Sequence, residues 1–516
     1  MLSRLHPSEK GYERLLIACI AAYSLVFFAA TLWKHLSFDS FAWDLGTFDQ
    51  ILYSSVFAGR PFYYALDLFM NPSGHYFAIH FSPILALLFP LYRVFPGVPL
   101  LLAVKSVAVA SAAYPLYLIT KRLTASPSTA FFLGVSYLLS PAIQGANWFD
   151  FQPQCLLPLL VFASFYFLIS GAVLPYLAAV SMTLAVEEHA VVIVLTMIAV
   201  YAIEVIMRRK STPMSRRQAL LIAATVALSL ATLAAGMYFK SAYPPSPPFN
   251  DIYDSSEAYS VLGSGGNAFT APLYAMTHPA DMLRAASYDS VLKTLYIVLL
   301  FAPLFFTPLL SGAPALGAVL LLPFLLSNYR AYYMIGAHYP FYVMPLMFVS
   351  AAHFLRGRGN LAKMIAISTV AFALVFSPIS PASTYLNASL SLLWYPDNTM
   401  TPATIAEIHA MIASIPADAS VLTQNHLFPH VSTRLEAYAV PVVHFDAQQL
   451  PAIEEYLRQL IARSEYLLID STDGGQLTPT LLRLIKAGTH SAVDSHGAVT
   501  LYRRAPRTRA QGRVNV

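Results

Sequence analysis

Acidic side chains stand next to apolar segments at several places in this sequence. Asp44 and Asp49 occur in FAWDLGTFDQ, shortly after an apolar segment that ends at Trp33, and Glu187 and Glu188 close another apolar segment. A carboxylate near apolar surroundings is poorly hydrated, which raises its pKa toward that of a group that accepts protons at neutral pH. This pattern predicts a general base, and Asp44 is the strongest candidate because it stands closest to the first apolar segment.

Other polar residues are predicted to lie on the same side of the membrane as these acids. They are His80, Asp150, His338 and Tyr339. Together with the acids above, they predict a substrate-binding cavity near the membrane surface. Structural roles stay open beside this interpretation. Asp44 could cap a short helix over LGTFDQILYSSVF, and Asp49 could be solvated on that helix. The two histidines could be hydrogen-bonded structural groups.

Glu187, Glu188 and His189 carry side chains that bind divalent cations. A Mg²⁺ or Mn²⁺ ion is therefore the one cofactor that the sequence suggests. These residues are predicted at the outer end of a helix, where adjacent side chains diverge by about 100° around the axis. At most two of them would then share an ion. A solvated turn at the interface is the alternative for the same residues.

The overall composition is that of a membrane protein. The sequence is 57% hydrophobic and 11% charged, with a mean hydropathy of +0.58. These values lie outside the range of soluble globular chains and predict a polytopic membrane protein in contact with the lipid bilayer. The net charge of +5 does not indicate a nucleic-acid partner, because the basic residues gather in short loops between apolar segments.

The apolar segments predict about 11 transmembrane helices, since a helix of roughly 20 apolar residues crosses a bilayer with its backbone hydrogen bonds satisfied. The predicted spans are residues 13–33, 99–120, 127–145, 153–170, 172–188, 189–207, 218–239, 290–311, 313–328, 337–356 and 361–379. The apolar stretch at 80–95 is shorter and contains Pro83 and Pro90. It is predicted to lie in the interface or to re-enter the membrane.

The basic loops predict the orientation of the chain. With a cytoplasmic N-terminus, every basic cluster between the predicted helices falls on one side. Residues 1–394 then form a transmembrane domain with outer loops at 34–98 and 240–289. Residues 395–505 alternate helical and β patterns and predict a small extracytoplasmic α/β domain. Residues 506–516 are predicted to be a basic tail. The predicted fold is an all-α polytopic protein of the cell membrane that carries this small domain.

Several motifs resemble an uncharacterised family of predicted multi-pass membrane proteins. They are DLGTFDQ, GRPFY, HFSPILALLFPLY, LSPAIQGANWFDFQP, AVEEHAVV and HYPFYVMP. The resemblance covers most of residues 40–355 and continues through SVLTQNHLFPH. That family in turn resembles the GT-C superfamily of integral-membrane glycosyltransferases. GT-C enzymes carry an acid in the first outer loop shortly after helix 1, then a proline-containing interfacial helix, and Asp44 and residues 80–95 match this arrangement.

The resemblance implies a function. It predicts an enzyme that moves a sugar from a polyprenyl-phosphate donor to an extracytoplasmic acceptor, with Asp44 as the catalytic base. Arg330 is the preferred contact for the leaving phosphate, and an interfacial arginine that reaches toward water is the alternative. The chain departs from the family at Gln152 and Gln154, where a histidine and an acid are expected. This departure argues against catalytic roles for these two residues.

Two other classes of protein stay open. A transporter or flippase would place ionisable residues near the middle of the membrane, where this sequence has few. A non-catalytic sensor or assembly factor would use the outer α/β domain for binding. The sequence carries no signal for an oligomeric state.

Overall fold

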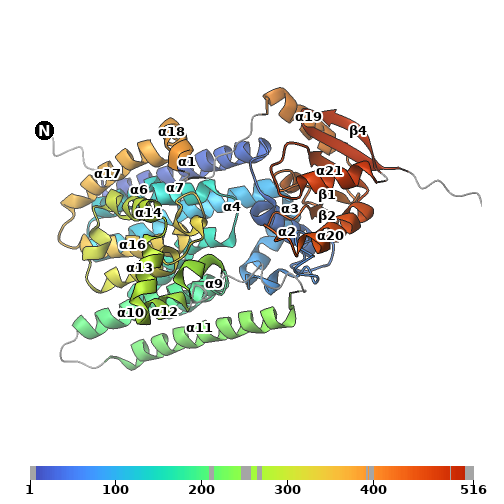
Figure 1. Ribbon diagram of the computed structural model, residues 1–516. Coiled ribbons are helices and arrows are strands. Elements are labelled where there is room, and N and C mark those ends of the chain that lie inside the picture. The colour runs from blue at the N-terminus through green and yellow to red at the C-terminus, as the bar shows by residue number, and fades with distance from the viewer. Residues whose placement is uncertain are drawn as a thin grey trace, which may run out of the picture.

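The structure is a computed structural model that describes residues 7–208, 214–245, 257–263, 270–390, 393, 400–488 and 490–505. A bundle of helices makes up most of the chain, and a small sheet with its own helices lies at one end of it (Figure 1). The predicted mostly helical chain with a small carboxyl-terminal sheet is confirmed. The predicted basic tail, residues 506–516, lies outside the described residues.

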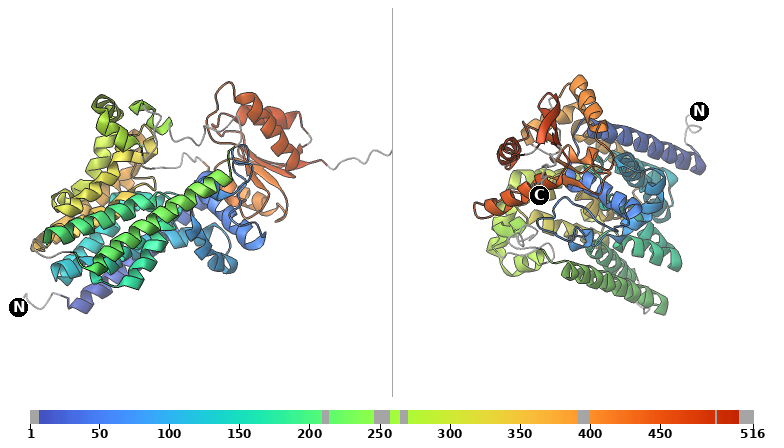
Figure 2. Two further views of the ribbon diagram at one scale, coloured as in Figure 1. Left: turned by 90° about the horizontal axis from the view of Figure 1, so that it is seen from below. Right: turned by 90° about the vertical axis from the view of Figure 1, so that its right-hand side faces the viewer.

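Sixteen helices make up the described part of the bundle. They are α1 (Glu9–Leu36), α4 (Val98–Ser111), α5 (Ala113–Thr124), α6 (Pro127–Leu139), α7 (Pro141–Trp148), α8 (Leu157–Ser170), α9 (Val173–Leu184), α10 (Ala190–Arg208), α11 (Arg216–Ala242), α12 (Ala271–Thr277), α13 (Pro279–Ser287), α14 (Ser290–Phe301), α15 (Leu322–Leu325), α16 (Pro340–Phe354), α17 (Asn360–Phe376) and α18 (Pro381–Leu390). Helices α10 and α11 pack side by side along one flank (Figure 2).

The prediction of about 11 spans is not confirmed. Among the described residues, five helices are long and apolar enough to cross a membrane, or up to seven if each bent pair counts as one span. Four of the predicted spans correspond to apolar helices of only 10–17 residues, namely Val173–Leu184, Ala313–Leu325, Pro340–Phe354 and Asn360–Phe376. The segment predicted at 290–311 leaves the α-helix after Phe301, where Phe305 and Phe306 take left-handed conformations beside Pro303. The segment at 313–328 begins as the 3₁₀ helix η9 (Ala313–Leu321).

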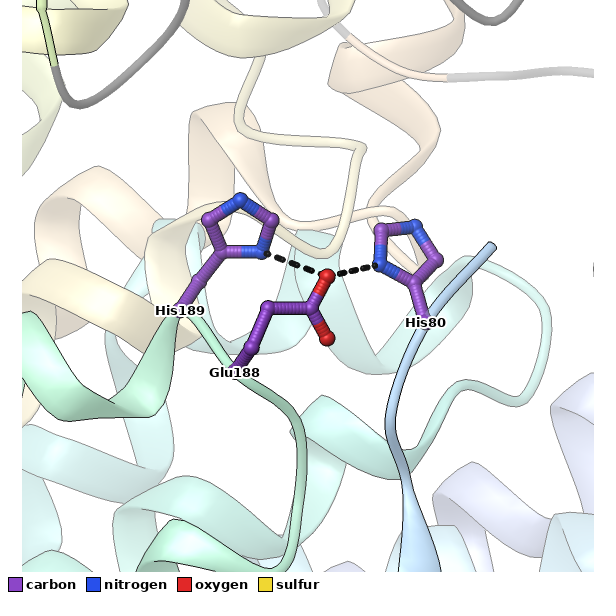
Figure 3. A group of neighbouring side chains, drawn as sticks. All are labelled: His80, Glu188 and His189. Carbon is purple, nitrogen blue, oxygen red and sulfur yellow. Dashed lines mark hydrogen bonds and ion pairs between the residues drawn. The ribbon is translucent and has the colours of Figure 1, made fainter. Parts of the chain in front are cut away.

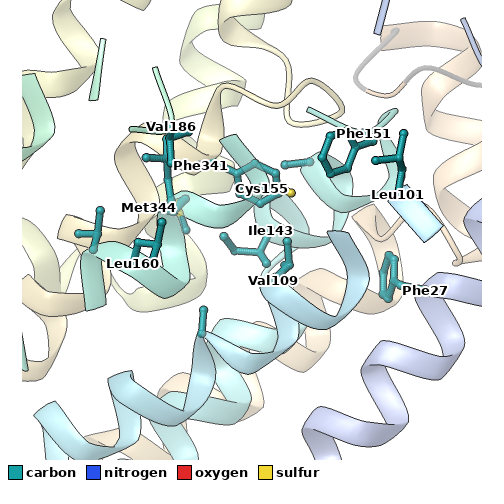
Figure 4. Packing of buried hydrophobic residues seen from close by; sticks show 14 of the residues in the cluster. Phe27, Leu101, Val109, Ile143, Phe151, Cys155, Leu160, Val186, Phe341 and Met344 are labelled. Atoms are coloured by element: carbon teal, nitrogen blue, oxygen red, sulfur yellow. The ribbon is translucent and has the colours of Figure 1, made fainter. Parts of the chain in front are cut away.

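The interior of the bundle is apolar and closely packed. Figure 4 shows side chains from α1, α4, α7, α8 and α16 meeting there, among them Phe27, Leu101, Ile143, Leu160 and Phe341. Each of these side chains is at most 7% exposed. Close contact of this kind is what holds helices together in a membrane, where lipid is as apolar as the side chains.

The first outer loop contains short helices that position acidic residues. It holds the π-helical turn η2 (Ala42–Gly46), α2 (Thr47–Phe57), the 3₁₀ turn η4 (Pro83–Leu88) and α3 (Phe89–Val94). The predicted short helical stretch at 80–95 corresponds to η4 and α3. Proline at the first or second position of each one removes an amide that would have no helical partner in any case.

The carboxyl-terminal unit is built on a five-stranded sheet in the order β2-β1-β3-β5-β4. Its strands are β1 (Val421–Thr423), β2 (Ala437–Ala439), β3 (Tyr466–Asp470), β4 (His490–His496) and β5 (Val499–Arg504), and its helices are α19 (Pro402–Ala413), α20 (Leu450–Arg463) and α21 (Thr478–Lys486). Strands β1, β2 and β3 are parallel, and β5 pairs antiparallel with β3 and β4.

The apolar core of this unit is shared with the first outer loop. Tyr63, Ala65, Phe69 and Met70 pack in the same cluster as the sheet residues. The predicted boundary at residue 395 lies outside the described residues and stays a prediction, and the two parts that it would separate bury this core together. In Figure 1 the sheet lies beside α2 and α3, at the opposite end of the bundle from the N-terminus. A cytoplasmic N-terminus stays a prediction.

Candidate functional site

A cavity of about 1040 Å³ lies where the first outer loop, the bundle and the carboxyl-terminal unit meet. Five of the predicted site residues line it: Asp44, His80, Glu187, His338 and Tyr339. Apolar side chains also line it, among them Val192, Ile193, Leu273, Val319, Leu320 and Leu322. The carboxyl-terminal unit contributes Asn425, Val442 and Val443. One cavity thus offers both an apolar and a polar surface.

Asp44 lies in the π-helical turn η2. A π turn holds one residue more per turn than an α-helix, and such turns occur often at functional sites. The Phe41 amide donates to Asp150 Oδ2 (2.6 Å), and the Ala42 amide donates to Asn425 Oδ1 (2.9 Å). Gly46 lies so close to Phe428 that a Cβ atom there would be 2.5 Å from its ring. These contacts hold the turn in place.

The Asp44 carboxylate is half-buried and accepts a hydrogen bond from the Gln152 side-chain amide. Burial raises the pKa of Asp44 to about 7, and the Asp150 carboxylate acts in the same direction. The Gln152 hydrogen bond and the Lys34 ammonium oppose this rise. Asp44 does not cap a helix, because no side chain caps η2 or α2. A pKa near 7 suits a group that accepts a proton at neutral pH.

Four of the predicted site residues do not line the cavity: Asp49, Asp150, Glu188 and Arg330. Asp49 is fully buried and accepts hydrogen bonds from the hydroxyls of Tyr92 and Ser432, both at 2.6 Å, so it is not solvated. Asp150 is buried in an ion pair with Lys34 at 2.9 Å. Arg330 is exposed, although its neighbours in the chain line the cavity.

Glu187, Glu188 and His189 lie in a non-helical turn between α9 and α10, not on a helix as predicted. Their side chains therefore need not diverge. Glu188 Oε1 is 3.2 Å from His80 Nδ1, 4.0 Å from His189 Nδ1 and 3.0 Å from Lys240 Nζ. Figure 3 shows the two imidazoles on either side of this carboxylate. One ligand atom from each of His80, Glu188 and His189 lies within 4.8 Å of the others.

The electrostatic environment keeps Glu188 ionised. Burial works against the charged form, but His80, His189 and Lys240 outweigh it and hold the pKa of Glu188 well below its usual range. The Phe81 amide also donates to Glu188 Oε2 at 2.8 Å. A carboxylate that is charged at neutral pH and faces two imidazoles suits a divalent cation.

The predictions missed two glutamines that bind the site acids. Gln152 donates to Asp44, and Gln154 Nε2 donates to Glu187 Oε2 at 2.5 Å. Tyr342 also donates its hydroxyl to Glu187. Both glutamines line the cavity, although the family pattern argued against roles for them. Their position beside Asp150, in FDFQPQ, is the signal that could have found them.

His338 presents a neutral imidazole to the cavity. It is 8% exposed, and within the described part of the chain its Nδ1 atom has no hydrogen-bond partner. Burial lowers the pKa of His338 to about 4. Its ring packs 4.0 Å from that of Tyr339, measured between centroids. A buried imidazole with an open nitrogen is able to bind a polar group of a substrate.

The fold is that of a known class of membrane protein. The structure is similar to that of ArnT from Cupriavidus metallidurans in the apo state, with a TM-score of 0.54 and 13% sequence identity, over 94% of this chain and 97% of the ArnT chain. At this level of identity the likeness concerns the fold, and it supports the resemblance to GT-C proteins. The chain belongs to the family described as "Predicted membrane protein (DUF2079)", which matches residues 34–485. No curated protein matches the sequence.

Proposed function

We propose that this protein is a membrane glycosyltransferase that moves a sugar from a polyprenyl-phosphate donor to an extracytoplasmic acceptor. One observation carries the proposal: a half-buried carboxylate, Asp44, whose pKa lies near 7, lines a cavity that is also lined by many apolar side chains. The apolar side chains suit a lipid chain, and the carboxylate suits a hydroxyl that must lose a proton. The GT-C-like fold supports this reading.

The transfer step follows from this arrangement. The acceptor oxygen forms a bond to the anomeric carbon of the sugar, and the bond from that carbon to the phosphate oxygen breaks. The electron pair leaves with the phosphate, and the hydroxyl proton passes to the Asp44 carboxylate. Gln152 orients this carboxylate through its hydrogen bond. Lys240 brings positive charge, and the imidazoles of His80 and His189 bring N–H donors, that suit the leaving phosphate. We propose these groups in place of the exposed Arg330.

The residues around Glu188 also fit a divalent cation. One carboxylate and two imidazoles form a mixed oxygen and nitrogen donor set, which favours Mn²⁺ or Zn²⁺ over Mg²⁺. When bound, such an ion would stabilise negative charge on the leaving phosphate. Lys240 lies against the same carboxylate and supplies positive charge in its own right.

Metal binding is a direct prediction. Purified protein titrated with Mn²⁺ in a calorimeter is expected to bind one equivalent, and Glu188→Gln or His80→Ala is expected to weaken the binding at least about tenfold. His353→Ala is the matched control, because His353 pairs with Glu204 at 3.1 Å and belongs to no group of three possible ligands among the described residues. Equal loss of affinity in the control would argue against the site.

The rate of transfer is expected to depend on the protonation of Asp44. Below about pH 7 the carboxylate holds a proton and cannot accept another, so kcat/KM should rise as the pH rises through about 7. The charged and titratable groups that face Asp44 are Asp150, Lys34, Tyr76, Tyr329 and Tyr339. A profile that stays flat between about pH 5 and about pH 9 would contradict the assignment of the base.

The function itself is tested by reconstitution. Vesicles that contain the purified protein are supplied with polyprenyl-phosphate-linked sugars labelled in the sugar, together with membrane extracts as acceptors. Labelled acceptor and free polyprenyl phosphate are the expected products. Movement of intact donor between leaflets without its consumption would favour a transporter instead.

A further inference from the structure

The turn that carries Asp44 is held from two separate parts of the chain. The first amides of a helical turn have no partner within it and need acceptors from elsewhere. Asp150, which follows α7 in the bundle, accepts from the Phe41 amide. Asn425, which follows β1 in the carboxyl-terminal unit, accepts from the Ala42 amide with its side-chain oxygen (2.9 Å) and its backbone oxygen (3.0 Å). The two acceptors therefore complete the turn together.

We infer that Asn425 and Asp150 are positioning residues for Asp44, so that docking of the carboxyl-terminal unit completes the site. This inference rests on the proposed role of Asp44 as the base. Asn425 is the better of the two residues for a test, because it also lines the cavity. Asp150 has a further structural role in its buried ion pair with Lys34.

Further contacts join the unit to the first outer loop beside this turn. The Gln50 side-chain amide donates to the backbone oxygens of Arg434 (3.1 Å) and Ala437 (3.0 Å). The Ser432 hydroxyl donates to Asp49 Oδ2 (2.6 Å), and Asp49 lies in α2, the helix that follows the turn. Phe428 packs against Gly46, where any larger residue would collide with it. The position of Asn425 relative to the turn is thus set by several independent contacts.

The first test measures the turn itself and needs no activity. Hydrogen exchange followed by mass spectrometry reports the amides of residues 41 and 42. Asn425→Ala removes the side-chain acceptor of the Ala42 amide and leaves the backbone oxygen of residue 425 in place. It is expected to speed exchange at residue 42 by up to about fivefold, the factor for loss of one ordinary hydrogen bond. Asn425→Asp keeps an acceptor oxygen and is expected to keep the slow exchange. Ser432→Ala removes a hydrogen bond at the same interface without touching the turn, and exchange at residues 41 and 42 should not change.

The second test measures catalysis. A base that is displaced from the acceptor hydroxyl lowers the rate of the chemical step, so Asn425→Ala is expected to lower kcat about 10- to 100-fold. The KM for the lipid donor should stay within about twofold, because the apolar side chains of the cavity are unchanged. Ser432→Ala is expected to keep the wild-type kcat.

The outcomes separate the inference from the proposed function. Unchanged exchange at residues 41 and 42 in Asn425→Ala overturns the inference, whether or not the protein transfers sugar. Faster exchange with an unchanged kcat overturns it as well. A wild-type protein that transfers no sugar counts against the proposed function, and the exchange result then still decides whether Asn425 holds the turn.

Discussion

Replacing Asp44 by asparagine is expected to lower the rate of sugar transfer at least about a hundredfold while the protein still inserts and folds. Asparagine keeps the size of the side chain and an oxygen that accepts from Gln152, but it cannot take up a proton. Loss of a general base lowers rates by about 10²- to 10⁴-fold. The measurement is transfer from a labelled polyprenyl-phosphate sugar in vesicles, with the melting temperature as a check on folding.

Asp49→Asn is the matched control for this experiment. Asp49 is a buried carboxylate on the adjoining helix α2, but its partners are Tyr92 and Ser432 and it does not line the cavity. The change weakens these hydrogen bonds and is expected to cost about 1 kcal/mol of stability with transfer retained. If Asp44→Asn transfers sugar at nearly the wild-type rate while Glu187→Gln or Glu188→Gln abolishes transfer, the base lies at the α9–α10 turn instead.

Lys34→Met is expected to have the largest effect on stability. Lys34 and Asp150 are each at most 3% exposed in their side chains, and their charged atoms are 2.9 Å apart. Methionine would leave the Asp150 carboxylate buried without its cation. Removal of one partner from a buried ion pair costs about 3–5 kcal/mol. Thermal unfolding in detergent, followed by the loss of helical circular dichroism, measures the effect.

The double variant Lys34→Met with Asp150→Asn shows whether the loss of stability comes from the unpaired Asp150 charge or from changed packing. It removes both charges and keeps an oxygen that accepts from the Phe41 amide. Replacement of a whole buried ion pair is often close to neutral, so most of the lost stability should return. A double variant as unstable as Lys34→Met alone would show that packing, and not the unpaired charge, causes the loss.

Several features of this protein follow from the sequence alone. Long apolar segments with few charges lead to a bundle of helices, because a backbone in lipid must satisfy its hydrogen bonds within each segment. The pattern after residue 400 leads to the small α/β unit. The choice of Asp44 also needed only local information, since an acid shortly after the first apolar segment lies near the membrane surface in any fold of this class.

The number of membrane spans depends on where each helix ends or breaks, which the composition of a segment does not specify. Apolar content is the same whether a segment continues as one helix or breaks at Phe305 and Phe306, and only the backbone geometry separates these cases. The same holds for Glu187, Glu188 and His189. A helix would have spread them, whereas the turn after α9 lets Glu188 meet His80, a residue 108 positions away in the chain.

The partners of Asp44 were decided only by tertiary structure. Gln152 is 108 residues from Asp44, and Asn425 is 383 residues from the amide of Ala42 that it accepts from. Neither contact leaves a periodic or local pattern, because a hydrogen bond depends on where two segments meet and not on their spacing along the chain. The sequence therefore determined the candidate base. The packing of the first outer loop against both the bundle and the carboxyl-terminal unit determined what holds that base, what raises its pKa and which cavity it faces.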